Sequence, residues 1–439
     1  MKNSFKPSAL LNEYALSGIY FVFLLLVLLI FGYTPANDTE GYIEYARICI
    51  EEGQPYPCLG TIEGQPFIWN IGIINLIAAS LAAFGSVYPL LPLFCLMNAL
   101  IALFVGKIGG LLFNRKVGLT AMLVYMCYPN NWGQCTLLLS ETPMILLMLA
   151  ALYLLLKYNK TSMLVIAGAL LFFANWFRSI ALIFILAICA YYVVFERKQL
   201  LRKVAPFLSG YLLCILVVGG ECYLRTGYFV YQSDTLWFNI CDDAYDGAFV
   251  GPHYGQETYE KGKPRYIENM ESLTCFECSE IWKSRCLPWI LDHKTEWLKK
   301  IPYRIFYMYK NDIDNISFSL PDKSNPENNF VVVPYRNILS EFGSLNRSQY
   351  LAIVASLAYF FVMCCAVAST IKLLRRKQFK SLSLPLFIIV GGTLMLTAVI
   401  HGETRFKAPF MPFVFILAAI SVYDIYAYVR NRRPRQRLK

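Results

Sequence analysis

Apolar runs of about 20 residues recur along this chain from Tyr14 to Val429, and short polar breaks separate them. A helix of that length spans the hydrocarbon core of a bilayer. Charged residues make up only 16% of the sequence, well below the roughly 25% typical of soluble domains. The first run is long enough to be an anchor, and no signal-peptide cleavage pattern follows it. The sequence therefore predicts an all-α polytopic membrane protein.

The formal net charge is +11, and the basic residues gather between the apolar runs. Basic residues beside membrane spans tend to stay in the cytoplasm. The clusters are Lys2 with Lys6, Arg115-Lys116, Lys157 with Lys160, Arg197-Lys198 with Arg202-Lys203, Arg375-Arg376-Lys377, and the tail from Arg430 to Lys439. The chain has no basic, aromatic-interleaved soluble domain, so we attribute the charge to topology and expect no nucleic-acid partner.

Placing every basic cluster in the cytoplasm predicts about ten transmembrane helices with both termini inside. The stretches between Lys116 and Lys157 and between Lys160 and Arg197 are then helical hairpins, because a single helix across either would greatly exceed the bilayer thickness. Pro66–Gly85 is expected to be a re-entrant or interfacial helix, since a span there would place the Arg115-Lys116 cluster outside. The other spans are Tyr14–Tyr33, Tyr88–Phe113, Val204–Cys222, Leu351–Leu374, Leu382–Ile400 and Pro409–Val429.

This topology predicts three regions. Residues 1–222 form an N-terminal transmembrane region that includes a first outer loop at 34–87. Residues 223–349 form an exported loop domain, and residues 350–439 form a C-terminal transmembrane region. The charged, chemistry-capable side chains then gather on the non-cytoplasmic face.

The first outer loop carries an acid at the start of a predicted amphipathic helix. Four of its residues share one face at helical spacing: Tyr42, Tyr45, Ala46 and Cys49. Such a helix is typical of a segment lying along a membrane surface. Asp38 falls in its first turn and is a candidate catalytic base. Asn37 and Glu40 also match a capping box, and an acid at this place favours the helix dipole, so a purely structural role stays open.

Further candidates lie at the outer ends of later spans. Glu141 opens the fourth span, where a carboxylate is costly unless it is paired or functional. The alternative is a structural role, with Ser140 as the N-cap of the helix and Glu141 as an acid in its first turn. The outer turn before the last span contains His401, Glu403, Arg405 and Lys407. Its two cations oppose the positive-inside bias, and they either hold an anionic phosphate or snorkel to lipid headgroups. Arg178, in the outer turn between the fifth and sixth spans, has the same two interpretations. His401 is either a general base or a structural residue.

Two acids and a cationic patch on one face suit the transfer of a group from a lipid-anchored phosphate. One acid deprotonates the acceptor, and the cations stabilise the departing phosphate.

These motifs resemble the GT-C glycosyltransferases. Asp38-x-x-x-Tyr42, followed by Ala46 and by Gly53-Gln54-Pro55-Tyr56, is similar to the first outer loop of family 39. That family includes the protein O-mannosyltransferases and the bacterial enzyme that adds aminoarabinose to lipid A. The acid that opens the fourth span, and the Arg405-Phe406-x-x-Pro409-x-x-Pro412 pattern before a late span, also resemble this family.

The resemblance implies a GT-C-like fold and a transferase that takes a sugar from a polyprenyl-phosphate donor. The acceptor would be an extracytoplasmic lipid, glycan or protein. Asp38 would be the catalytic base, the anomeric centre would invert, and Glu141 would assist or help bind the acceptor. Arg405, Lys407 and Arg178 would bind the donor phosphate. The remaining candidates for substrate contact are Glu40, Tyr42, His401 and Glu403.

The acidic motif departs from the family pattern. Thr39 separates Asp38 from Glu40, whereas the acidic pair of the family is adjacent. The Asp-x-Glu spacing resembles the metal-dependent oligosaccharyltransferase branch. We expect no cofactor, while a divalent metal ion stays open as the alternative. Gln65 also replaces a basic residue often found before the position of Pro66.

Cysteines occur in both outer segments: Cys49 and Cys58 in the first, and Cys241, Cys275, Cys278 and Cys286 in the second. Disulfides are the default outside the cytoplasm. The set of Cys275, Cys278, Cys286 and His293 also matches a zinc site with three cysteines and one histidine. Disulfides, zinc ligands and free thiols all stay open, and sequence alone does not give the pairing.

Two other functions are considered: a polysaccharide polymerase or ligase, and a transporter or flippase of lipid-linked glycans. Transporters carry ionisable residues near the bilayer midplane and inverted repeats. Here Glu221, Lys107 and Asp424 all lie near span ends, which favours an enzyme at the outer interface. We expect a bacterial plasma membrane with the active site on its extracytoplasmic face.

Overall fold

The computed structural model describes residues 12–35, 37–244, 261–262, 265–320, 340 and 342–432, which form helices and connections without a strand. The first helices are α1 (Glu13–Phe31), α2 (Asn37–Glu51), α3 (Leu59–Glu63), α4 (Ile71–Phe84), α5 (Leu90–Leu112), α6 (Arg115–Met126), α7 (Pro129–Gly133), α8 (Glu141–Lys157), α9 (Thr161–Phe177), α10 (Ala181–Phe195) and α11 (Leu200–Thr226). They are followed by α12 (Leu236–Ala244), α13 (Cys275–Asp292), α14 (Lys294–Tyr309), α15 (Asp314–Ser319), α17 (Arg347–Arg375), α18 (Phe379–Leu386), α19 (Gly392–Val399) and α20 (Met411–Arg432). The predicted all-α membrane fold is confirmed.

Six helical stretches among the described residues are long and apolar enough to cross a membrane. They are Glu13–Phe31, Leu90–Leu112, Arg197–Thr226, Arg347–Arg375, Phe379–Val399 and Met411–Asn431. Each of the two predicted hairpins contains two helices of 12 to 17 residues: α6 and α8 in the first, and α9 and α10 in the second. The helices of one hairpin do not pack mainly on each other, because α6 lies against α5 and α20, α8 against α5 and α9, and α9 against α8 and α11. The total of about ten spans and the division into three regions stay predictions.

The stretch Pro66–Gly85 contains α4, which is 14 residues long. At 1.5 Å per residue it reaches about 21 Å, less than the roughly 30 Å of a hydrocarbon core. Ile71, Ile73, Ile74 and Ile77 are buried along it. Because α6, with 12 residues, is shorter still, length does not distinguish the two cases, and the non-spanning assignment of α4 stays a prediction.

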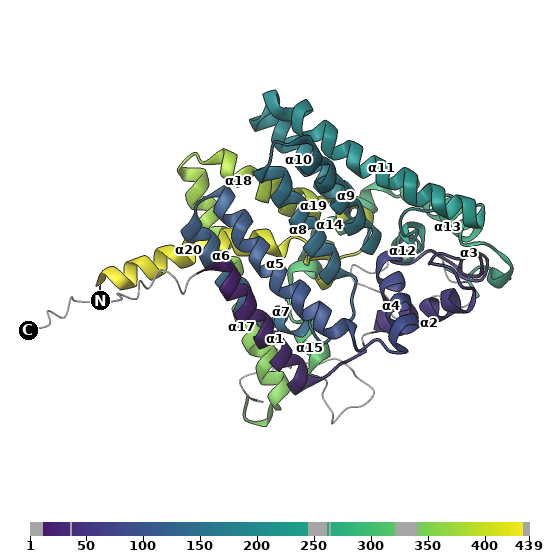
Figure 1. Cartoon of the computed structure of the whole chain (residues 1–439), viewed down its shortest axis with the longest axis horizontal. Coiled ribbons are helices and arrows are strands. Elements are labelled where there is room, and N and C mark those ends of the chain that lie inside the picture. The colour runs from purple at the N-terminus through teal and green to yellow at the C-terminus, as the bar shows by residue number, and fades with distance from the viewer. Residues whose placement is uncertain are drawn as a thin grey trace, which may run out of the picture.

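The amphipathic helix of the first outer loop is α2. Its four apolar positions (Tyr42, Tyr45, Ala46 and Cys49) are buried, as the helical spacing predicted. They pack into the same hydrophobic cluster as α4, however, so this face is covered by protein and not by lipid. Figure 1 shows α2, α3 and α4 beside one another on one flank of the bundle.

The helices of the bundle alternate in direction, so chemically related groups collect at its two ends. Ion pairs at one end join α1 to α5 (Glu13 with Lys107) and α17 to α20 (Lys372 with Asp424). The opposite end contains the N-termini of α8 and α20 and the C-termini of α1 and α9. The first ten residues of α20 are all buried in the main core, which anchors the loop that precedes them. Glu141, Arg178 and Arg405 therefore come to the same end of the bundle.

Candidate functional site

Two ion pairs form the centre of the candidate site. Arg405, in the loop before α20, binds the carboxylate of Asp38 at the start of α2. Arg178, which follows α9, binds the carboxylate of Glu141 at the start of α8. These four residues are separated by up to 367 positions, and the antiparallel bundle brings them together as two acid–cation pairs.

Tyr42 lies close to both ion pairs. It lies one helical turn after Asp38, so the two side chains share a face of α2. The pKa of Tyr42 is raised because the side chain is fully buried, and Asp38 and Glu141 raise it further while Arg405 and Arg178 oppose them. All four charged groups are thus close enough to act on one phenol.

A hydrogen-bond network holds Tyr42 between α4 and α8. Asn70 Nδ2 donates to the Tyr42 hydroxyl at 2.9 Å and to Ser140 Oγ at 3.3 Å. Ser140 Oγ in turn donates to Glu141 Oε2 at 3.3 Å. Ser140 precedes α8 but makes no side-chain capping bond, so its observed role is in this network. The Asn37 side chain proposed for a capping box lies outside the described residues.

The pairs are partly accessible to a ligand. The exposed fraction is 29% for the Arg405 side chain, 20% for Asp38 and 19% for Arg178, against 9% for Glu141. The Arg178 guanidinium also lies 5.2 Å from the centre of the Phe406 ring, next to Arg405 in sequence. Arg178 is therefore in contact with the loop that carries Arg405, and both guanidinium groups act on Tyr42.

Two further charged residues of the loop before α20, Glu403 and Lys407, are buried. Glu403 Oε1 lies 2.8 Å from Arg405 Nε, so Glu403 orients the guanidinium. Lys407 is fully buried, pairs with Asp312 at 3.0 Å, and donates to the carbonyl of Asn311 at 2.7 Å. Lys407 was predicted to bind the donor phosphate. Burial and these partners leave it no access to one, so we assign it to the support of the loop.

His401 and Glu40 also differ from their predicted positions in the substrate site. His401 is buried, with Nδ1 3.4 Å from Asp243 Oδ2. Arg304 of α14 approaches the same carboxylate at 3.9 Å. Glu40 is exposed on α2 and acts electrostatically on Tyr33. His401 therefore contacts the α12–α14 region, and Glu40 lies on a different side of α2 from Asp38.

Two buried charge clusters beneath the site escaped prediction: Asp243 with Arg304, and Asp312 with Asp314. Asp243 belonged to an acidic run in the exported segment, but its partners are contributed by α14 and by the loop before α20. Tyr128 donates to Asp312 at 2.6 Å, which links the second cluster to the connection between α6 and α7. The signal in the sequence for the first cluster is that Asp242, Asp243 and Asp246 lie close together in residues 223–349.

The described residues do not bring together three or more His, Cys, Asp or Glu side chains that could hold a metal ion. The Asp38-x-Glu40 spacing falls on a helix, where residues two apart do not face each other. The suggested zinc set is not assembled either. Cys286 hydrogen-bonds with Cys241, Cys275 lies in the cluster of α2 and α4, and His293 is exposed with Nδ1 2.8 Å from the Trp289 carbonyl.

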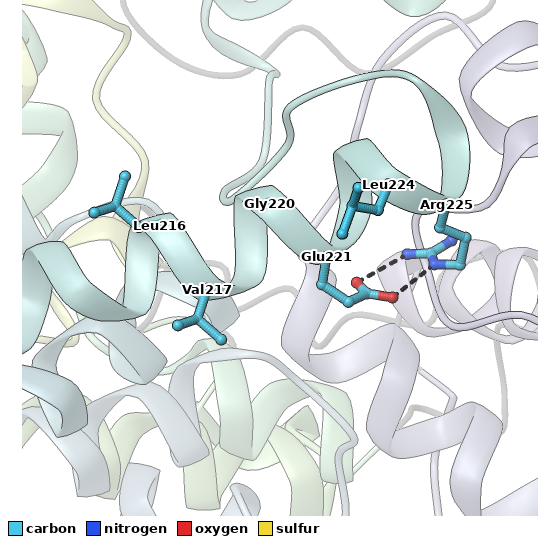
Figure 2. Close-up of a pocket in the computed structure, with 6 residues that line it drawn as sticks. All are labelled: Leu216, Val217, Gly220, Glu221, Leu224 and Arg225. Atoms are coloured by element: carbon cyan, nitrogen blue, oxygen red, sulfur yellow. Dashed lines mark hydrogen bonds and ion pairs between the residues drawn. The ribbon is translucent and has the colours of Figure 1, made fainter.

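A separate hollow of about 550 Å³ lies along one face of α11. Figure 2 shows Glu221 and Arg225 pointing toward one another there, beside apolar side chains. Arg225 also donates to the Pro57 carbonyl at 2.8 Å. The hollow contains neither of the two central ion pairs, so we assign Arg225 to the attachment of α11 to the first outer loop.

Comparisons with known proteins find similarity in part of the sequence and in the fold. Residues 71–220 match the family model of dolichyl-phosphate-mannose-protein mannosyltransferases. The fold is similar to the crystal structure of the Archaeoglobus fulgidus oligosaccharyltransferase in its apo form, with a TM-score of 0.52 and 12% sequence identity. That match covers 98% of this chain and 52% of the archaeal protein, so the chain spans about half its length. A search of curated protein sequences finds no match.

Proposed function

We propose that this chain is a membrane glycosyltransferase of the GT-C type, and that it moves a sugar from a polyprenyl phosphate to an extracytoplasmic acceptor. The matching family model and the similar fold support the proposal. The observation that carries this proposal is the Asp38–Arg405 pair beside the Glu141–Arg178 pair. Acids and cations at one end of an apolar bundle suit a substrate whose phosphate stays at the membrane surface.

In the proposed reaction Asp38 removes the proton from the acceptor nucleophile. The nucleophile then forms a bond to the anomeric carbon, and the bond from that carbon to the phosphate oxygen breaks with inversion. The departing polyprenyl phosphate gains negative charge, which Arg405 and Arg178 stabilise. Glu141 helps to bind the acceptor.

In this mechanism, binding of the donor phosphate to Arg405 precedes the action of Asp38 as a base. The Arg405 guanidinium binds Asp38 when no donor is present and is also oriented by Glu403. A donor phosphate competes for the same guanidinium, which weakens its hold on Asp38 and makes the carboxylate available as a base. The proposal uses no metal ion, because Asp38 is paired with Arg405 and Glu40 lies on another side of α2.

The test uses purified protein, a panel of polyprenyl-phosphate sugars, and both donor binding and product formation as readouts. Asp38→Asn should keep donor binding and lose about 10²- to 10⁴-fold in transfer, the usual contribution of a general base. Arg405→Ala should lose donor binding. Glu221→Gln, at an ion pair outside the site, is the matched control. Wild-type protein that binds none of these donors, together with an unaffected Asp38→Asn variant, would support a transporter instead.

A further inference from the structure

Two pairs of cysteine thiols are in contact in the segments that flank the candidate site. Cys49 lies in the last turn of α2, and its Sγ is 3.3 Å from the Sγ of Cys58, just before α3. Cys241 of α12 hydrogen-bonds with Cys286 of α13. All four thiols are buried, so each pair meets inside the protein and not at its surface.

We propose that Cys49–Cys58 and Cys241–Cys286 are disulfides in the mature protein. The inference rests on the proposed function in one respect, the placement of both segments outside the cytoplasm, where oxidising conditions make disulfides the default. Among the cysteines of the two outer segments, the contacts select these two pairings from the many that the sequence allows.

The contact between the Cys49 and Cys58 thiols also acts on their pKa values. The pKa of Cys58 is lowered to about 7, chiefly by the hydrogen bond between the Cys49 and Cys58 thiols, while burial opposes this effect and hydrogen bonds with Thr61 add to it. Cys58 N–H in turn donates to Thr61 Oγ1 at 3.0 Å, which holds the residue at the start of α3. A thiol that is partly ionised near neutral pH is the reactive form in disulfide exchange.

The oxidant in this step is the disulfide of a thiol-oxidising exchange protein. The Cys58 thiolate attacks one sulfur of that disulfide, which breaks and releases a thiolate. The Cys49 thiolate then attacks Cys58 in the mixed disulfide and releases the second sulfur. Two cysteine thiols lose two protons and two electrons, and the exchange protein is reduced to its dithiol. The same exchange joins Cys241 to Cys286. Both exchanges take place before the helices pack, because all four thiols are buried in the folded protein.

Each disulfide would restrain one of the two segments that carry the Asp38–Arg405 ion pair. The first ties the C-terminal end of α2, the helix that starts beside Asp38, to a loop already held by the bond from Arg225 to Pro57. The second holds α12 against α13. Asp243 follows Cys241 by two residues and faces His401, in the loop that carries Arg405. The two disulfides therefore act as covalent supports for the two elements that meet at the ion pair.

The experiment is thiol mapping of the wild-type chain in its own membrane. Free thiols are trapped with N-ethylmaleimide before lysis, and the denatured protein is cleaved after glutamate without reduction. This cleavage separates Cys49 from Cys58 at Glu51 and Glu52, and Cys241 from Cys286 at Glu277 and Glu280. We expect linked peptides for both pairs, each lighter by two hydrogen atoms than its reduced parts, and an alkylated Cys127, at the C-terminal end of α6, as the exposed control.

Complete alkylation of these four cysteines, or linkage to other partners such as Cys275 or Cys278, would overturn the inference. Sugar transfer by the same preparation is measured in parallel. If the protein transfers sugar while its four thiols are free, the disulfide proposal is wrong and the proposed reaction stands. If both linked peptides are found in a protein that transfers no sugar, the proposed reaction is wrong and the disulfides stand. A reductant should also lower the melting temperature of the wild type by several degrees, and should have little further effect on a variant in which all four are serine.

Discussion

Gly402 lies against the backbone of Arg304 so closely that a β-carbon at residue 402 would be 2.0 Å from the Arg304 carbonyl oxygen. Arg304 is fully buried and its Nη1 donates to the Thr397 carbonyl at 3.0 Å, so the helix cannot easily move away. The loop that carries Arg405 is thus seated on α14, and only glycine permits this approach.

Gly402→Ala should therefore displace Arg405 while leaving the bundle folded. A shift of about 1 Å at a catalytic group costs on the order of 10²-fold, and we expect a loss of that size in kcat/KM. Steady-state transfer with varied donor is the measurement. Gly110→Ala is the control, since a β-carbon at residue 110 would have nothing within 4 Å of it. Equal activities of the two variants would show that the loop does not depend on this contact.

Glu141→Gln should weaken acceptor use and spare donor binding. The carboxylate is nearly buried and paired with Arg178, beside the Tyr42 network. Loss of one hydrogen bond to a charged group is worth about 1.5–3 kcal/mol, which corresponds to about 10- to 100-fold in kcat/KM for the acceptor. Donor affinity is measured on the same preparation, and an equal fall in both parameters would argue against an acceptor role.

Lys407→Met should destabilise the fold. The lysine is fully buried and pairs with Asp312, whose carboxylate would stay buried without its cation. Breaking a buried pair in this way costs about 3–5 kcal/mol. The free energy of unfolding is measured in detergent micelles. Lys372→Met, at a more exposed pair with Asp424, should cost no more than about 1 kcal/mol. Similar losses in the two variants would contradict the assigned role of Lys407.

Asp314→Asn should stabilise the protein increasingly as pH rises. Burial raises the pKa of Asp314 above its ordinary value of 3.8, and the charge of Lys407 and a bond from Thr404 only partly offset this. An acid with a raised pKa in the folded state stabilises the fold below its unfolded pKa, and this contribution is lost as pH rises through the folded value. The Asp314→Asn side chain does not ionise, so the variant does not lose this stability as pH rises.

Melting temperatures of wild type and Asp314→Asn, measured from pH 4 upward, test this prediction. The difference between them should grow with pH, beginning above the ordinary aspartate pKa. Asp292→Asn, at an exposed position of α13, is the comparison. A difference that stays constant across the pH range would mean that Asp314 titrates alike in the folded and unfolded chain.

Several features of this protein could be predicted from local sequence. Apolar runs long enough to span a bilayer indicated the helical membrane fold, because backbone groups inside a bilayer must be satisfied within a helix. The basic clusters indicated that the stretches between Lys116 and Lys157 and between Lys160 and Arg197 each contain two helices, as α6 with α8 and α9 with α10 do. The helical spacing of Tyr42, Tyr45, Ala46 and Cys49 identified the buried face of α2.

Tertiary structure alone decided which charges meet. Arg405 and Lys407 are two residues apart and carry the same charge, yet one reaches Asp38 while the other is buried against Asp312. Their directions depend on how α2, α15 and the loop before α20 pack together, which no short sequence window contains. The same holds for the thiol contacts of Cys49 with Cys58 and Cys241 with Cys286. Periodicity determines which face of a helix is apolar, whereas the partner of a buried charge or thiol is determined by contacts between distant segments.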